Sequence, residues 1–72
     1  MKAYEVIAKK VKDVGISNAE LGRRIDMDSE LVRRCLAGER KIIADEMVAF
    51  SVELGLEIAD FQKSSEEETD GD

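Results

Sequence analysis

The sequence predicts a small all-helical domain, and three observations support this fold class. The 72-residue chain contains no proline, the residue that most strongly interrupts helices. Aliphatic residues recur at helical spacing, as in Ala3, Ile7, Val11 and Val14, which we expect to share the inward face of a first helix. Aromatic residues make up only 4% of the chain. Aliphatic side chains must therefore fill the core.

Four helices and a terminal helical turn are expected, because residues that cap or end helices separate the periodic stretches. Gly15, Gly38 and Gly55 each follow such a stretch and are suited to ending a helix. Ser17 and Glu20 fit a capping box, in which each side chain accepts a hydrogen bond from the other residue's backbone N–H. The predicted helices are residues 3–14, 17–25, 29–37 and 44–54, with a helical turn at 56–61.

The second and third helices are joined by a tight turn at Asp26 and Met27, and Asp28 can cap the third helix. Gly22 lies in the middle of the second helix, where glycine costs up to about 1 kcal/mol relative to alanine. We therefore expect another helix to pack against Gly22 too closely for a larger side chain.

The formal net charge of −6 is unevenly distributed along the chain. Residues 1–44 contain ten Lys or Arg and seven Asp or Glu, whereas residues 45–63 contain one Lys and five acids. Positive charge is therefore concentrated in the first two-thirds, where a phosphate-bearing partner would bind. A chain this short has room for one domain, which we expect at residues 1–63, followed by a disordered acidic tail at residues 64–72.

Several function classes lack the residues that their chemistry needs. The chain contains no histidine, no nucleophile–base pair and no phosphate-cradling glycine loop, so we expect neither an enzyme nor a cofactor. Asp26, Asp28 and Glu30 lack the glycine and the distant bidentate glutamate of a calcium loop, so no metal site is expected. Cys35 has no partner cysteine and is expected in the core. No signal peptide or membrane-length apolar run occurs, which predicts a cytoplasmic protein without a membrane partner.

The stretch Gly-Ile-Ser-Asn-Ala-Glu-Leu-Gly-Arg-Arg-Ile, from Gly15 to Ile25, resembles the phage repressor/Cro (Xre) family of DNA-binding proteins. This resemblance covers roughly residues 3–61. It implies a compact, four- to five-helix, lambda-repressor-like domain with its helix-turn-helix at about residues 17–37. The other stretches that carry the resemblance are Asp28–Arg34, Gly38–Lys41 and Leu54–Leu56.

The resemblance also implies which residues contact DNA. Arginine suits the guanine edge and glutamate accepts from the cytosine amino group, while other residues hold the phosphate backbone. The implied base-reading residues, near the start of the recognition helix, are Ser29, Glu30, Arg33 and Arg34. The implied backbone contacts are Asn18, Arg23, Arg40 and Lys41.

Three features depart from the family pattern. Asp26 stands in the turn where the family often has glycine, but aspartate adopts left-handed backbone more readily than most residues. Val11 and Leu36 replace an Arg–Glu pair that is frequent in the family, and because both are apolar no charge is left unpaired. Asp26, Asp28 and Glu30 also place acids at the DNA-facing corner, where nearby basic side chains must neutralise them.

The helix at 44–54 carries more apolar surface than one core-facing stripe requires. Val48, Val52 and Leu56 extend this surface, and we expect them to form a homodimer contact. Such a dimer would set two recognition helices about 34 Å apart on a palindromic operator. The alternative is that the terminal turn at 56–61 covers this surface.

The resemblance, together with these patterns, implies a phage or bacterial transcriptional regulator, such as a repressor, that binds double-stranded DNA as a homodimer. The alternative is a protein-binding module, such as an antitoxin or adaptor. It would keep the fold and use the fourth helix and the acidic surface to contact a protein partner. Charge reversal at Arg33 and Arg34 would distinguish the two hypotheses, because only DNA binding should be lost.

Overall fold

The computed structural model describes residues 1–62, and every regular element in this range is helical. The expectation of an all-helical chain is therefore confirmed for these residues, whereas the expected disordered tail at 64–72 lies outside them. A short fifth helical segment occupies residues 58–62. The four longer helices are α1 (Ala3–Val14), α2 (Asn18–Ile25), α3 (Ser29–Leu36) and α4 (Ala44–Leu54).

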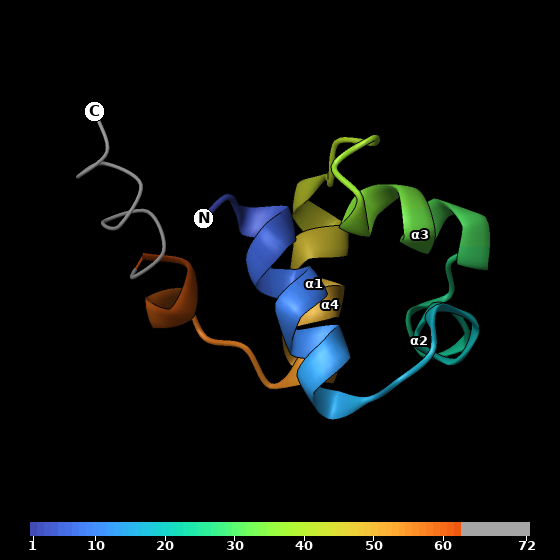
Figure 1. Ribbon diagram of the computed structural model, residues 1–72, viewed down its shortest axis with the longest axis horizontal. Helices are drawn as coiled ribbons and strands as arrows, with labels where there is room; N and C mark the ends of the chain where they lie inside the picture. Colours follow the sequence, from blue (N-terminus) through green and yellow to red (C-terminus); the bar gives the residue numbers. More distant parts are fainter. Residues whose placement is uncertain (63–72) are drawn as a thin grey trace.

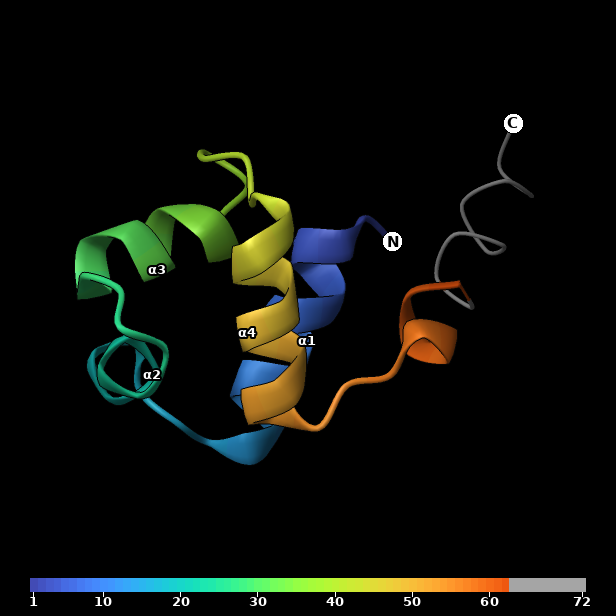
Figure 2. The ribbon, with the colours of Figure 1, turned by 180° about the vertical axis from the view of Figure 1, so that it is seen from behind.

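Helices α1 and α4 lie side by side at the centre of the molecule and run in the same direction (Figures 1 and 2). Helices α2 and α3 form a corner on one side of this pair, and the helical turn at 58–62 lies on the other side. Because α2 also contacts α4 and α1 also contacts α3, the corner is attached to the central pair through both of its helices.

Every one of the four longer helices contributes to a single apolar core. Helix α3 contributes two fully buried side chains, one of which is Cys35, so the expected core position of this cysteine is confirmed. Leu36 and the aromatic ring of Phe61 are half-buried and pack against the same cluster. The side chains with no exposed surface are Ile7, Leu21, Val32, Cys35 and Phe50.

The inward face of α1 differs in part from the prediction. Ile7 and Val11 are buried as expected, but Ala3 is exposed and Val14 keeps 53% of its surface exposed. Val6, which was not among the residues expected on this face, is buried at 9% exposed. The reason is that Ala3 and Val14 lie at the two ends of the helix, where neighbours surround a side chain on fewer sides.

The end of α3 lies against the aromatic ring of Tyr4, a contact that no pattern in the sequence predicts. Gly38 follows the helix with a φ angle of 77°, and its N–H donates to the carbonyl oxygen of Cys35 at 3.2 Å. A Cβ atom at Gly38 would lie 2.6 Å from Cζ of Tyr4. The left-handed backbone favours glycine at this position, and the ring of Tyr4, which lies against Gly38, joins the start of α1 to the end of α3.

The corner between α2 and α3 depends on the close approach of two backbone segments at Gly22. A Cβ atom on this residue would lie 2.4 Å from the carbonyl oxygen of Met27 and 3.5 Å from Cγ2 of Val32. The expectation of close packing is confirmed, but the neighbour is different. The turn itself, not another helix, excludes a side chain here, because the N–H of Met27 donates to the carbonyl oxygen of Gly22 at 2.8 Å.

Replacing Gly22 by alanine should destabilise the protein by about 1–3 kcal/mol, because the added methyl group collides with the backbone of the turn. This loss opposes the gain of up to about 1 kcal/mol that alanine brings to helix propensity. Chemical denaturation would measure the difference. The matched control is Ala19→Gly in the same helix, at an exposed position where propensity alone acts; an unchanged or increased stability of the Gly22 variant would contradict the packing argument.

Candidate functional site

The outer face of α3 presents the four residues that the sequence marks as base-reading candidates. Its inner face is anchored in the core through Val32 and Cys35, which leaves the opposite face open. The helix begins at a well-formed cap, since the carboxylate of Asp28 accepts a hydrogen bond from the N–H of Glu30 at 2.8 Å. The exposed residues on the outer face are Ser29, Glu30, Arg33 and Arg34.

The turn that precedes α3 has the backbone conformation predicted for it. Asp26 has a φ angle of 59° and a ψ angle of 47°, in the left-handed region, and it is the only non-glycine residue among 1–62 with a positive φ. Its N–H donates back to α2, at the carbonyl oxygen of Gly22. The side chain of Asp26 remains exposed at this corner.

Two carboxylates hold Arg33. Its Nε and Nη2 donate to the two carboxylate oxygens of Glu30 at 3.0 and 2.9 Å, and Nη2 also donates to Glu39 at 3.3 Å. These bonds lower the pKa of Glu30 and raise the pKa of Arg33. Two of the four base-reading candidates therefore bind each other in the free protein. We call the Glu30–Arg33–Glu39 group the arginine clamp.

Arg34 differs from its neighbour. Its side chain is exposed and makes no hydrogen bond or ion pair with any residue in the range 1–62. Its positive charge still contributes to the lowered pKa of Glu30, after the larger effect of the hydrogen bond from Arg33. Lys41, in the loop that follows α3, is also exposed. These two side chains are the open positive charges at the end of α3 and in the loop after it.

At the start of α2, half of the predicted capping box forms. Ser17 Oγ accepts from the N–H of Glu20 at 3.1 Å, but the carboxylate of Glu20 accepts from Arg23 and, at 3.1 Å, from Arg24. The hydrogen bond from Arg23 is the main cause of the lowered pKa of Glu20. Arg23, a predicted backbone contact, is thus paired but exposed, while Asn18 is half-buried at the first position of the helix.

Arg40 has a structural role that the sequence did not reveal. Its Nη1 donates to Glu46 Oε1 at 2.7 Å and to the buried sulfur of Cys35 at 3.3 Å. Glu46 also accepts from the N–H of Ile43 at 3.1 Å, at the start of α4. Although predicted to contact phosphate, Arg40 is half-buried and joins the end of α3 to the beginning of α4. Only the folded chain brings this arginine to that carboxylate.

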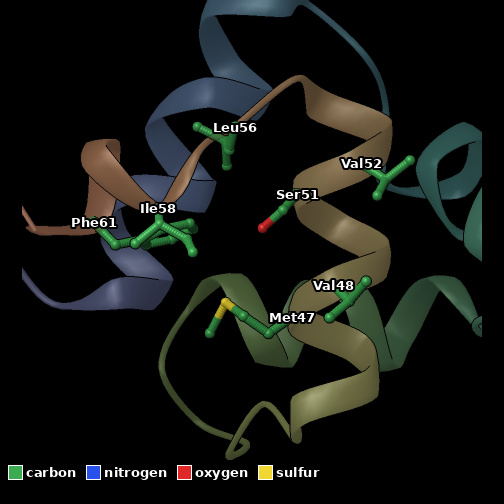
Figure 3. A pocket seen from close by; sticks show the side chains of 7 residues that line it. All are labelled: Met47, Val48, Ser51, Val52, Leu56, Ile58 and Phe61. Atoms are coloured by element: carbon green, nitrogen blue, oxygen red, sulfur yellow. The ribbon is translucent and has the colours of Figure 1, made fainter.

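The predicted dimer residues line an apolar groove between α4 and the segment that follows it (Figure 3). The groove has a volume of about 270 Å³, and Val48 and Val52 keep 61% and 76% of their surface exposed. Ile58, at 75% exposed, lies on the opposite wall. The terminal turn leaves Val48 and Val52 exposed, so the alternative that it covers this surface is wrong for these two residues, whereas Leu56 is half-buried. The lining residues are Met47, Val48, Ser51, Val52, Leu56, Ile58 and Phe61.

No helix within residues 1–62 has both the length and the apolar character to cross a membrane. In this same part of the chain, no three His, Cys, Asp or Glu side chains converge in an arrangement that could hold a metal ion. Comparisons with protein-family models, with curated proteins and with solved structures find no match to this chain.

The ion pair of Glu46 makes stability depend on pH. Hydrogen bonding to Arg40 lowers the pKa of Glu46 in the folded protein. The ion pair therefore contributes fully to the free energy of unfolding above the unfolded pKa of about 4.3, and this contribution is lost as pH falls through the lower pKa of the folded state. Glu46→Gln should lower the melting temperature by a few degrees at pH 7. Between about pH 5 and pH 3, the melting temperature of this variant should fall less than that of the wild type.

Thermal unfolding followed by circular dichroism across this pH range would test the prediction. Asp45→Asn is the matched control, because it removes one exposed negative charge from the same turn of α4. If both variants showed the same melting temperatures at every pH, the pair with Arg40 would contribute nothing to the pH dependence.

Proposed function

We propose that this protein is a sequence-specific, DNA-binding transcriptional regulator of the helix-turn-helix type, acting in the cytoplasm as a homodimer on a palindromic operator. One observation carries the proposal: α3 is fixed to the core through Val32 and Cys35, while its outer face presents four exposed polar residues at a corner of the molecule. A short polar helix held in this way suits insertion into a major groove, which is wide enough for one helix.

The charges at this corner favour recognition of bases over general attraction to phosphate. The arginine clamp contains two carboxylates and one guanidinium, and Asp26 and Asp28 add further negative charge. Arg34 and Lys41 supply the open positive charges. Because few phosphates would be neutralised, non-specific binding should be weak, and the affinity for an operator should depend mainly on contacts with base edges.

The groove beside α4 supports association of two copies. Val48 and Val52 form an exposed apolar ridge on α4, and Ile58 forms a second one across the groove. In an isologous contact, the same surface of each copy would cover that of the other. This arrangement leaves α3 of each copy free, since α3 and the terminal turn lie on opposite sides of the central helix pair.

A protein-binding module is the second candidate, and the charge around the groove favours it. Residues 42–62 contain five Asp or Glu and no Lys or Arg. Two copies meeting at this face would bring like charges together, whereas a basic partner with apolar side chains would complement it. In this alternative the groove binds a basic segment of another protein and α3 is an ordinary exposed surface.

Selection from a pool of random duplex DNA at two salt concentrations would test the proposed function. We expect enrichment of a palindrome, with half-site spacing set by the dimer. Lys41→Gln should weaken binding to all sequences equally and lower the slope of log affinity against log salt by about 1, because one phosphate contact is lost. The control is Lys12→Gln, which removes the same charge from an exposed position of α1. Absence of any enriched sequence would exclude operator recognition and favour the protein-binding alternative.

In the proposed homodimer, the groove supplies the contact between the two copies. Val52→Asp should convert a homodimer into a folded monomer, because a carboxylate would have to be buried in an apolar contact. Analytical ultracentrifugation would measure the association. Val14→Asp introduces the same group at an exposed valine of α1 outside the groove and should leave the dimer intact. A wild-type chain that stays monomeric at high micromolar concentration would contradict the homodimer.

A further inference from the structure

We infer that Arg34 is the base-reading arginine of α3, and that Arg33 instead positions the loop after the helix. This inference rests on the proposed function. The resemblance implied base reading by both arginines, and here only one of them has that role. The adjacent residues carry the same charge on the same exposed surface. They differ in what already occupies their guanidinium groups.

Most donors of Arg33 are committed within the arginine clamp. A guanidinium contacts guanine by donating two hydrogen bonds from one edge, to O6 and N7. In Arg33 the edge formed by Nε and Nη2 donates to both oxygens of Glu30. The other edge is formed by Nη1 and Nη2, and Nη2 also donates to Glu39 at 3.3 Å. Only Nη1 remains open, so Arg33 cannot make a two-bond contact without leaving at least one carboxylate.

The guanidinium group of Arg34 keeps all of its N–H donors available. Its side chain donates to no other residue in the described range, and the step of about 100° between consecutive helix positions points it away from the direction of Arg33. It can therefore present both terminal nitrogens to a base without breaking an existing bond. An arginine with this freedom matches guanine better than any other base, because guanine alone offers two acceptors on its major-groove edge.

The clamp gives Glu30 and Arg33 a different role. Glu30 uses both carboxylate oxygens on Arg33, so in this arrangement it is not free to accept from a cytosine amino group. Arg33 in turn connects the first turn of α3 to Glu39, six residues further along the chain. Glu39 belongs to the loop that carries Lys41. Arg33 thus holds this loop against α3, and its loss should affect affinity for every DNA sequence alike.

A matched pair of substitutions tests this division. Arg34→Gln and Arg33→Gln remove the same charge from neighbouring exposed positions of one helix. In selections from random duplex DNA, Arg34→Gln should abolish the preference for guanine at one position in each half-site. Its affinity for the best wild-type site should fall roughly tenfold to a hundredfold. Arg33→Gln should keep the wild-type consensus and weaken binding to cognate and unrelated duplexes by the same factor.

Lysine substitutions separate charge from geometry. Arg33→Lys keeps a positive charge beside Glu30 and Glu39 and should restore most of the general affinity. Arg34→Lys should not restore the guanine preference, because an ammonium group lacks the planar fork of arginine. Melting curves of all four variants would establish that each one folds.

The outcomes of this experiment are distinct. Loss of the guanine preference in Arg33→Gln, or its survival in Arg34→Gln, would overturn the inference while leaving the proposed function intact. A wild-type protein that enriches no sequence would overturn the proposed function, and the inference with it.

Discussion

The contact between Gly22 and the carbonyl oxygen of Met27 is the constraint on which the rest of the structure depends. It lets the chain reverse direction within a few residues, with Asp26 in the left-handed region, and bring the second helix of the corner directly against the first. Once α3 leaves the turn in this way, Val32 and Cys35 enter the core. The face of α3 that carries its arginines is therefore exposed because the opposite face is fixed.

Ion pairs organise the charged residues of this acidic chain. Arg24 bridges Glu20 within α2 and Glu53 on α4, and Arg40 bridges the end of α3 to Glu46. Four of the five arginines are paired within residues 1–62, each with at least one glutamate. The net charge of −6 therefore says little about the surface that a partner meets. What a partner meets depends on which charged groups the fold pairs and which it leaves unpaired.

The two surfaces considered for function are separated by the central pair of helices. The outer face of α3 lies on one side of α1 and α4, and the turn that walls the groove lies on the other (Figures 1 and 2). One surface is polar and carries arginines, whereas the other is apolar with acidic residues in the surrounding sequence. Their separation means that a partner on the groove need not displace a partner on α3, and one small domain can engage both.

The sequence by itself determined the helical class, the positions of the four helices to within about one residue, the left-handed turn at Asp26 and the buried Cys35. These features depend on apolar spacing and capping within a few residues. Tertiary structure alone decided that Arg33 also binds Glu39 in the following loop, that Arg40 binds Glu46, and that the ring of Tyr4 packs on Gly38. Such contacts depend on how side chains from different segments meet, and that is fixed only when the helices pack.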